Sequence, residues 1–261
     1  MSTVERGELF GVPIDLLTMS QTVEIIREAV VARRSLQHVA LNVAKLVMLQ
    51  KDSVLRDDVL GCDIIGVDGA GILIAARLFG VPVPECVTGI DLMMELLAMC
   101  AREGFRPYFL GGTESVVSAA AEQAQRRWPS LSFAGIRNGY FKPEEEADIA
   151  RGIKDSGADC LFVGISSPIK ERFCRFHRDS MNVPFIMGVG GSFDVLAGKT
   201  HRAPRLMRRA GMEWLFRLVQ EPSRMWRRYL TTNSAFGWMI LRAFMKGYRG
   251  HTWVNTAVSD P

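Results

Sequence analysis

The sequence lacks the short patterns that mark several common classes of enzyme. Its five cysteines form no CxxC pair and its four histidines are dispersed, which argues against a metal centre and against a disulfide framework. Neither the Walker pattern G-x-x-x-x-G-K-[ST] nor the dinucleotide pattern G-x-G-x-x-G occurs, so a P-loop nucleotidase or a nicotinamide enzyme is not expected. There is also no D-x-D pair, the arrangement that would hold a divalent ion beside a nucleotide diphosphate.

Long apolar segments and targeting patterns are missing as well. The N-terminal stretch MSTVERGELFGV has no basic-then-apolar signal pattern, and no run of 18 apolar residues is present to span a membrane. Unpaired thiols fit a reducing compartment, so we expect a cytoplasmic protein. A hydrophobic content of 48% over 261 residues supports a full core in one large domain, or in a domain with an appendage.

Acidic residues are scarce in one part of the chain. From Lys199 to Arg249 the sequence has 12 lysines and arginines against two acidic residues, Glu213 and Glu221, although the whole chain has 32 basic and 28 acidic residues. The rest of the chain is therefore net acidic. Such asymmetry indicates an anionic partner: a phosphate-bearing lipid, a membrane surface or a nucleic acid.

What the chain does have, up to about residue 198, is an alternation of strand-like and helix-like segments. Strands at a spacing of roughly 30 residues with helices between them predict βαβ units and an α/β fold with a mostly parallel sheet. The expected strands are Leu9–Leu17 (one or two strands), Gln37–Asn42, Asp63–Val67, Pro107–Leu110, Leu131–Ile136, Cys160–Val163 and Phe185–Val189. The expected helices include Ser20–Arg34 capped by Ser20, Val43–Leu60, Thr88–Glu103 capped by Thr88, Ser115–Trp128, Pro143–Asp155 and Pro168–Arg178.

The pattern changes after residue 198, where strand-like segments stop and arginine and tryptophan become frequent. We predict helices over Ala203–Gln220 and Pro222–Tyr248, and divide the chain into a core of residues 1–198 and a helical, basic appendage of residues 199–261. Two interpretations of the appendage stay open. It is either a helical pair docked on the core with a solvated basic face, or an amphipathic basic helix that lies on a membrane surface.

Several expected strands end in polar or glycine residues. Ligands of open α/β sheets bind beyond the carboxyl ends of the strands, where glycines let backbone N–H groups approach phosphate oxygens. Several such ends in one chain therefore predict a binding site for an anionic ligand. The residues at these ends are Asn42 with Lys45, Asp68 with Gly69, Gly111 with Gly112, Gly164, and Gly190 and Gly191 with Asp194.

Two aspartates at these ends have alternative interpretations. Asp68 lies between a strand and a helix, where it either caps the helix or acts as a general base that takes a proton from an attacking hydroxyl. Asp194 either caps the short helix after the glycine pair or accepts a hydrogen bond from a base such as uracil. The missing D-x-D pair favours neutralisation of a diphosphate by arginines, lysines and helix N-termini.

Taken together, eight stretches of the sequence resemble the WecG/TagA/CpsF family of bacterial glycosyltransferases (glycosyltransferase family 26). They run from about Leu9 to Tyr229 and are FGVPIDLLT, LNVAKLV, VDGAGI, TGIDL, FLGGTE, SSPIKE, GVGGSFD and THRAP…EWLFRLVQEPSRMWRRY. The last is the most specific, because no general helix rule produces those spacings of arginine, tryptophan and proline. The resemblance implies a Rossmann-like core and an inverting transfer, without metal or other cofactor, of a sugar from a UDP donor to a polyprenyl-diphosphate-linked saccharide.

The resemblance also implies roles for individual residues. Asp68 would be the catalytic base, Asn42 would hold the sugar and Asp194 would contact the uracil. Arg217, Arg224 and Arg227 would meet the diphosphate groups, and the appendage would bind the lipid-linked acceptor at the inner face of the cell membrane. The other residues expected to bind substrate are Lys45, Gly69, Thr88, Asp91, Gly111, Gly112, Lys170, Gly190 and Gly191.

Three expected pocket positions depart from the family pattern. Ala40 stands where a threonine is common, Cys86 where an arginine is common, and Lys170 where a glutamine is common. Lys170 is then a candidate to replace the missing arginine as a phosphate partner. The donor sugar, N-acetylmannosamine, glucose or a uronic acid, stays open.

Other kinds of protein remain alternatives. The chain could be a catalytically altered family member that acts as a partner subunit, or a basic nucleotide- or nucleic-acid-binding protein. A nucleic-acid partner is not expected, because the tryptophans of the tail are spaced for packing or interfacial burial. A homo-oligomer is compatible with the sequence.

Overall fold

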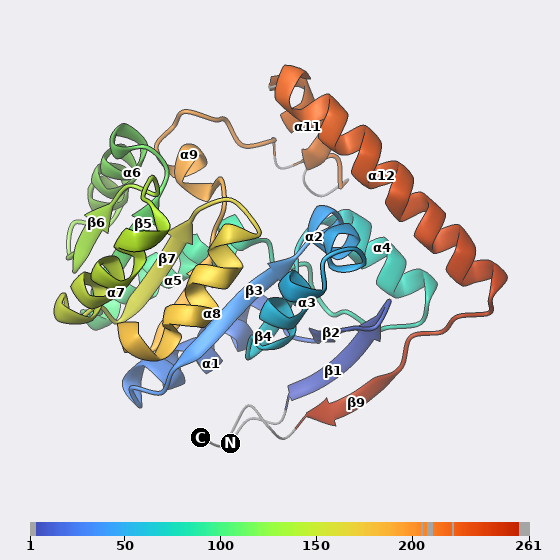
Figure 1. Ribbon diagram of the computed structural model, residues 1–261, viewed down its shortest axis with the longest axis horizontal. Helices are drawn as coiled ribbons and strands as arrows, with labels where there is room; N and C mark the ends of the chain where they lie inside the picture. Colours follow the sequence, from blue (N-terminus) through green and yellow to red (C-terminus); the bar gives the residue numbers. More distant parts are fainter. Residues whose placement is uncertain (1–3, 205, 208–210, 221, 256–261) are drawn as a thin grey trace.

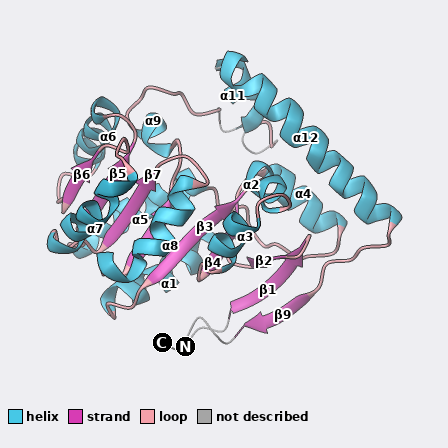
Figure 2. Cartoon of the chain, viewed as in Figure 1, coloured by secondary structure: helices cyan, strands magenta, loops and turns pink. Residues whose placement is uncertain are grey.

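The computed structural model describes residues 4–204, 206–207, 211–220 and 222–255, and contains two β-sheets (Figures 1 and 2). The larger sheet has six parallel strands in the order β4-β3-β8-β7-β5-β6, which confirms the predicted α/β class. Its strands are β3 (Leu36–Leu41), β4 (Ile64–Val67), β5 (Pro107–Gly111), β6 (Gly135–Arg137), β7 (Cys160–Gly164) and β8 (Phe185–Gly188).

Helices cover both faces of this sheet. They are α1 (Met19–Val31), α2 (Val43–Leu49), α3 (Ser53–Leu60), α4 (Ala70–Leu78), α5 (Gly89–Glu103), α6 (Glu114–Arg127), the 3₁₀ turn η1 (Pro143–Glu145), α7 (Glu146–Asp155), α8 (Ile169–Met181) and α9 (Ser192–Leu196). Helices α1, α5, α6 and α9 pack on one face, whereas α7 and α8 pack on the other. Because the six strands of the larger sheet are parallel, their carboxyl ends lie at one edge, where the connections to the helices begin.

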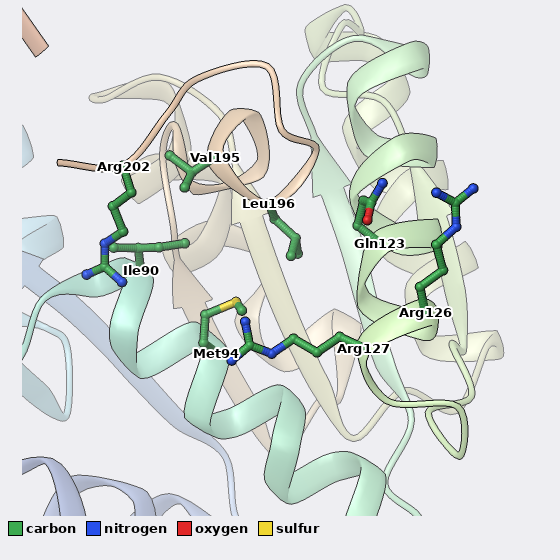
Figure 3. Close-up of a pocket in the computed structure, with 8 residues that line it drawn as sticks. All are labelled: Ile90, Met94, Gln123, Arg126, Arg127, Val195, Leu196 and Arg202. Carbon is green, nitrogen blue, oxygen red and sulfur yellow. The ribbon is translucent and has the colours of Figure 1, made fainter. Parts of the chain in front are cut away.

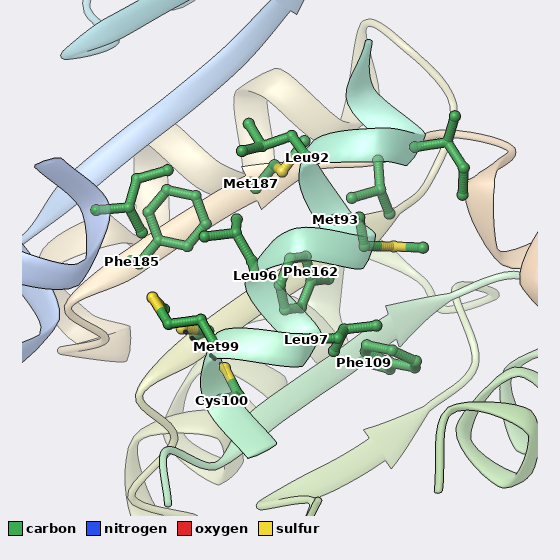
Figure 4. Packing of buried hydrophobic residues seen from close by; sticks show 14 of the residues in the cluster. Leu92, Met93, Leu96, Leu97, Met99, Cys100, Phe109, Phe162, Phe185 and Met187 are labelled. Carbon is green, nitrogen blue, oxygen red and sulfur yellow. Dashed lines mark hydrogen bonds between the residues drawn. The ribbon is translucent and has the colours of Figure 1, made fainter. Parts of the chain in front are cut away.

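Helix α5 packs one face into the core of the larger sheet (Figure 4). Thr88 caps it as predicted, and Gly104 ends it with a φ of 77°. Its side chains Leu92, Leu96 and Leu97 are fully buried against the phenylalanines and methionine of β5, β7 and β8. This close packing fixes the strands, and with them the positions of the residues that follow each strand.

Several predicted boundaries were wrong for local reasons. Helix α1 is capped by Thr18 instead of Ser20, since the Thr18 side chain accepts from the Gln21 N–H. The helix expected over Val43–Leu60 is two helices, because Asp52 caps α3 by accepting from the Leu55 N–H. In the segment expected to be a strand over Leu131–Ile136, only residues from Gly135 onward form β6.

The second sheet has three antiparallel strands in the order β2-β1-β9, with β1 (Val4–Leu9), β2 (Val12–Asp15) and β9 (Thr252–Asn255). The strand expected from Leu9 begins earlier and is broken by a turn in which Phe10 and Gly11 have φ values of 53° and 72°. Strand β9 contradicts the prediction that strands stop after residue 198. It joins the end of the chain to its beginning.

The C-terminal segment forms α11 (Glu213–Gln220) and α12 (Pro222–Met245). The helix predicted over Ala203–Gln220 was too long, since residues 201–204 are not helical and α11 begins at Glu213. Helix α12 runs past α2 and α4 (Figure 1). Phe236 of α12 is buried in the hydrophobic cluster to which these two helices contribute. Within the described residues, no helix combines the length and apolar character needed to cross a bilayer.

Candidate functional site

Strands β3 and β4 bring Asn42 and Asp68 side by side. The register pairs Leu41 with Val67, so that the next residue of each strand lies at the same level of the sheet edge. The Asp68 N–H donates to the Leu41 carbonyl at 2.9 Å. Asn42 caps α2 by accepting from the Lys45 N–H through Oδ1, at 3.0 Å, so its amide NH₂ is left to donate to the Asp68 carboxylate.

Asp68 is not a helix cap. The N-cap of α4 is Gly69, which has a φ of 92° and no side chain to accept a hydrogen bond. Burial raises the pKa of Asp68 above its ordinary value, and the Glu213 carboxylate adds to this effect against Arg217, Asn42 and Lys45, which favour the ionised form. Such a carboxyl group is suited to accept and release a proton.

Helix α11 brings a second carboxylate to this site that the sequence did not predict. Glu213 and Arg217 are one turn apart and lie 3.7 Å from each other, and both act electrostatically on Asp68. The predicted Arg217 therefore acts on Asp68 through its charge, which favours the ionised carboxylate. The fixed spacing of four residues on a helix was the only sequence signal for Glu213.

Lys45 and Lys170 meet at one buried carboxylate, that of Glu171. The Lys45 ammonium lies 2.7 Å from Glu171 Oε1, the Lys170 ammonium lies 3.4 Å from it, and the Ser167 hydroxyl donates to it at 2.9 Å. Burial acts to raise the pKa of Glu171, but the two ammonium groups and these hydrogen bonds lower it to about 2. Both lysines were predicted as site residues, whereas Glu171 was not.

Glycines line the edge where β5, β7 and β8 end. Gly111 is paired with Gly164, and a Cβ on Gly111 would lie 2.5 Å from the Gly164 backbone. Gly112 and Gly190 have φ values of 68° and 52°, in the region that favours glycine. The predicted glycine-rich edge thus exists, with Gly191 as the N-cap of α9.

Asp194 lies in the first turn of α9 and is not its cap. Its backbone carbonyl accepts hydrogen bonds from the N–H groups of Lys199 and Thr200, at 2.9 and 3.1 Å. Its carboxylate lies 3.7 Å from the Lys199 ammonium and is about one-third exposed. The carboxylate is therefore accessible for a ligand at this edge.

Thr88 and Asp91 form a third group, at the start of α5. The Thr88 hydroxyl donates to Asp91 at 2.7 Å, and both terminal nitrogens of Arg202 donate to the same carboxylate. Arg202 was not predicted as a site residue. This bidentate pair fixes the segment after α9 to the core.

A cleft of about 480 Å³ lies beside this pair (Figure 3). Helices α5, α6 and α9 form its walls, and Arg202 lines one edge of it. Its lining combines four apolar side chains, three arginines and a glutamine: Ile90, Met94, Val195, Leu196, Arg126, Arg127, Arg202 and Gln123. None of the residues around Asp68 belongs to this lining, so the cleft and the Asp68 site are separate features.

Two of the predicted arginines lie on α12, and Cys86 is one of the positions that differ from the family pattern. Arg227 is exposed and its guanidinium lies over the Trp226 ring, whereas the Arg224 side chain lies outside the described part of the chain. Cys86 lies beside Asp68, where its sulfur accepts a hydrogen bond from the Gly69 N–H at 3.1 Å. Burial and the Asp68 charge raise the pKa of this thiol to about 11, so Cys86 provides no positive charge.

Cation-binding side chains do not cluster in the part of the chain that the structure describes. No three histidine, cysteine, aspartate or glutamate side chains there lie close enough to hold a metal ion. The charged groups that converge at the sheet edge are instead lysines and arginines with single carboxylate partners.

Comparison with known proteins identifies a family and one curated relative. Residues 7–250 match the model of the family described as "Glycosyl transferase WecG/TagA/CpsF family". The chain is also 34% identical over 163 residues to the N-acetylglucosaminyldiphosphoundecaprenol N-acetyl-beta-D-mannosaminyltransferase of Bacillus spizizenii. This similarity covers 62% of the chain and 62% of the length of that relative.

Proposed function

Because this chain belongs to the WecG/TagA/CpsF family of glycosyl transferases, we propose that it transfers a sugar from a UDP-sugar to a saccharide on a polyprenyl diphosphate. The name of the Bacillus relative contains such an acceptor, an N-acetylglucosaminyl diphosphoundecaprenol, and an N-acetylmannosaminyl donor group. The donor proposed here is a UDP-sugar of the N-acetylmannosamine type, or one that carries glucose or a uronic acid. The product would enter the synthesis of a cell-surface polysaccharide.

The observation that carries this proposal is the environment of Asp68. Asp68 directly follows the parallel strand β4, and its carboxylate accepts a hydrogen bond from the Asn42 amide. Burial and the Glu213 charge raise the pKa of this carboxylate. In the proposed reaction Asp68 takes the proton of the acceptor hydroxyl as that oxygen attacks the anomeric carbon. The UDP group leaves from the opposite face, so that the configuration is inverted.

The basic C-terminal helices supply the charge that the leaving diphosphate requires. The charge of Arg217 acts on Asp68, and we propose that Arg217, together with Arg224 and Arg227 of α12, meets the diphosphate when a donor is bound. The glycine edge and Asp194 would hold the nucleotide, with backbone N–H groups toward the phosphates. Donors oriented in advance toward a developing negative charge are worth a few kcal/mol each, on the order of 10²-fold in rate.

Removal of divalent metal ions is expected to leave the rate of transfer within about twofold. The reason is that guanidinium groups would take the diphosphate charge in place of an ion. The measurement is the initial rate of UDP release in EDTA, compared with the rate after addition of Mg²⁺ or Mn²⁺. A rate that falls by tenfold in EDTA and returns with one of these ions contradicts this part of the proposal.

The decisive experiment is product analysis. Purified protein is incubated with a panel of UDP-sugars and with polyprenyl-diphosphate-linked monosaccharide acceptors, and the products are separated by mass and anomeric configuration. One donor is expected to yield an elongated acceptor with inverted configuration. Absence of transfer from every donor, with intact UDP binding, would favour a partner subunit that has lost activity.

We also propose that α12 binds the membrane surface on which the acceptor lies. Its exposed apolar side chains include Trp226, Trp238, Leu241, Phe244 and Met245, the basic residues Arg227 and Arg242 lie on the same helix, and Lys246 directly follows it. An amphipathic helix of this composition lies in the interface of an anionic bilayer.

Replacing Trp238 by serine is expected to weaken binding to vesicles that contain anionic lipid by about tenfold, since burial of a large apolar side chain is worth roughly 1.5–3 kcal/mol. The measurement is flotation with vesicles of neutral or partly anionic lipid. Phe176→Ser on α8 is the matched control, because Phe176 is 82% exposed on a different helix. Equal loss in both variants would refute a specific role of α12.

A further inference from the structure

The buried charges beneath the candidate site do not balance. Lys45 and Lys170 share the single carboxylate of Glu171, and all three side chains are less than one-tenth exposed. The second oxygen of that carboxylate, Oε2, is buried without a hydrogen-bond partner in the described part of the structure. Buried charges are normally paired, so two ammonium groups around one carboxylate need an explanation beyond stability.

The position of this cluster connects it to three strand ends. Lys45 lies in the first turn of α2, and its backbone N–H holds the Asn42 side chain. Ser167 and Glu171 belong to the connection after β7 and to α8. The carbon chain of Lys170 packs against Gly188 at the end of β8, where a Cβ would lie 2.5 Å from Lys170 Cε.

We propose that Glu171 is a positioning residue for the transfer reaction, whose carboxylate holds Lys45 and Lys170 as a cationic support beneath the Asn42–Asp68 pair. This inference rests on the proposed function, because it concerns the same site. Glu171 holds the Lys45 ammonium and so fixes the first turn of α2. The Lys45 backbone N–H in that turn holds the Asn42 side chain, whose NH₂ donates to Asp68. The excess positive charge of the support favours the ionised form of Asp68 and the approach of an anionic donor.

Other charged groups act on Asp68 as well. Glu213 and Arg217 of α11 and Lys45 of α2 act on its pKa, and the neutral Cys86 thiol lies beside it in the segment before α5. Within the support, burial lowers the pKa of Lys170, and the charge of Lys45 lowers it further against the effect of Glu171. Removing one charge of the support at a time therefore has a predictable sign.

The test compares the pH dependence of kcat/KM in the wild type, Glu171→Gln and Lys170→Gln. Glu171→Gln removes a negative charge, so the acid limb of the profile is expected to move to lower pH by roughly half a unit. The value of kcat/KM should also fall by about tenfold or more, because the Lys45 ammonium loses its carboxylate partner. Lys170→Gln removes a positive charge, and its acid limb is expected to move to higher pH by a similar amount.

A matched control is Glu122→Gln on α6, which changes the net charge equally at an exposed position. Its acid limb should coincide with that of the wild type. If Glu171→Gln and Lys170→Gln lower stability but leave the acid limb in place, Glu171 has a structural role only and the proposal is wrong. A wild type without any transfer activity overturns the proposed function itself, which is a different pattern of results.

The melting temperature provides a measurement that needs no turnover. A buried lysine whose pKa lies below the value in the unfolded chain, about 10.4, releases its proton on folding, so stability rises with pH through this range. Loss of the carboxylate should make this rise steeper in Glu171→Gln than in the wild type, in the pH range just below the pKa of the unfolded lysine. The double variant Lys170→Gln/Glu171→Gln, with one buried ammonium left, should return toward the wild-type slope. Equal slopes in all variants would show that the support is not charged.

Discussion

Replacing Asp68 by asparagine is expected to lower kcat by about 10²- to 10⁴-fold, the contribution of a well-placed general base. Asparagine has nearly the same shape as aspartate and can still contact Asn42, but it cannot take a proton from the acceptor hydroxyl. The measurement is the initial rate of transfer with saturating donor and acceptor. A turnover number close to that of the wild type would remove Asp68 from the role of base.

The affinity for UDP separates loss of chemistry from loss of the site. The Asp68 carboxylate acts on Arg217, which is the expected partner of the diphosphate. Removing this negative charge removes a competitor for the guanidinium, so UDP should bind Asp68→Asn as tightly as the wild type, or more tightly. Calorimetry with UDP checks this point. A large loss of affinity would indicate that the substitution disturbs the site as a whole.

The pKa of Asp68 also gives the sign of the pH dependence. A general base acts only when it is deprotonated, so kcat/KM of the wild type should rise with pH through the pKa of Asp68. Because burial and Glu213 raise that pKa, this rise should lie above the pH range of an ordinary aspartate. Glu213→Gln should therefore move the rise to lower pH.

Parts of this site could be predicted from the sequence because they depend on strand ends. In a parallel sheet all carboxyl ends meet at one edge, so polar residues after separate strands are brought together by the fold class alone. Asn42 and Asp68 were predicted in this way, and the register of β3 and β4 places them side by side. The glycines after β5 and β8 follow from the same rule.

Glu171, Glu213 and Arg202 could not be found in this way, because their importance comes from partners on other elements. Glu171 has its first partner 126 residues earlier in the chain, and Arg202 has its partner Asp91 111 residues earlier. A charged residue on a helix is usually solvated, and its sequence neighbours do not show that a distant side chain meets it. Only the packing of α8 on the sheet and of the segment after α9 on α5 makes these pairs visible.

Strand β9 could not be predicted from the sequence for a related reason. Strand β9 has only four residues, and its partner β1 lies at the opposite end of the chain. No turn connects the two strands, so no hairpin pattern marks them. The predicted division at residue 198 therefore leaves out a structural link, since the last described strand of the appendage pairs with the first strand of the core.

Replacing Tyr248 by alanine is expected to lower the free energy of unfolding by about 2–3 kcal/mol. Tyr248 follows α12 and stacks on Phe10 with ring centroids 5.6 Å apart, while Phe79 meets it edge-on at 5.2 Å. Its hydroxyl also accepts a hydrogen bond from the Phe10 N–H at 2.9 Å. The measurement is equilibrium unfolding in urea, with Tyr248→Phe as the control. The phenylalanine variant keeps the stacked ring and should lose only about 1 kcal/mol, the usual contribution of one hydrogen bond.

The same variant tests how α12 is held. The helix is attached near its middle by Phe236, which is buried against α2 and α4, and at its end by Tyr248 and β9. The segment before α11 is attached separately, by Arg202 to Asp91. The attachment at the end of α12 could determine where Arg224 and Arg227 lie relative to the donor. In that case Tyr248→Ala should raise KM for the donor more than Tyr248→Phe does, at a temperature where both variants are folded. If both variants keep the wild-type KM, the arginines are positioned by α11 and the Arg202–Asp91 pair alone.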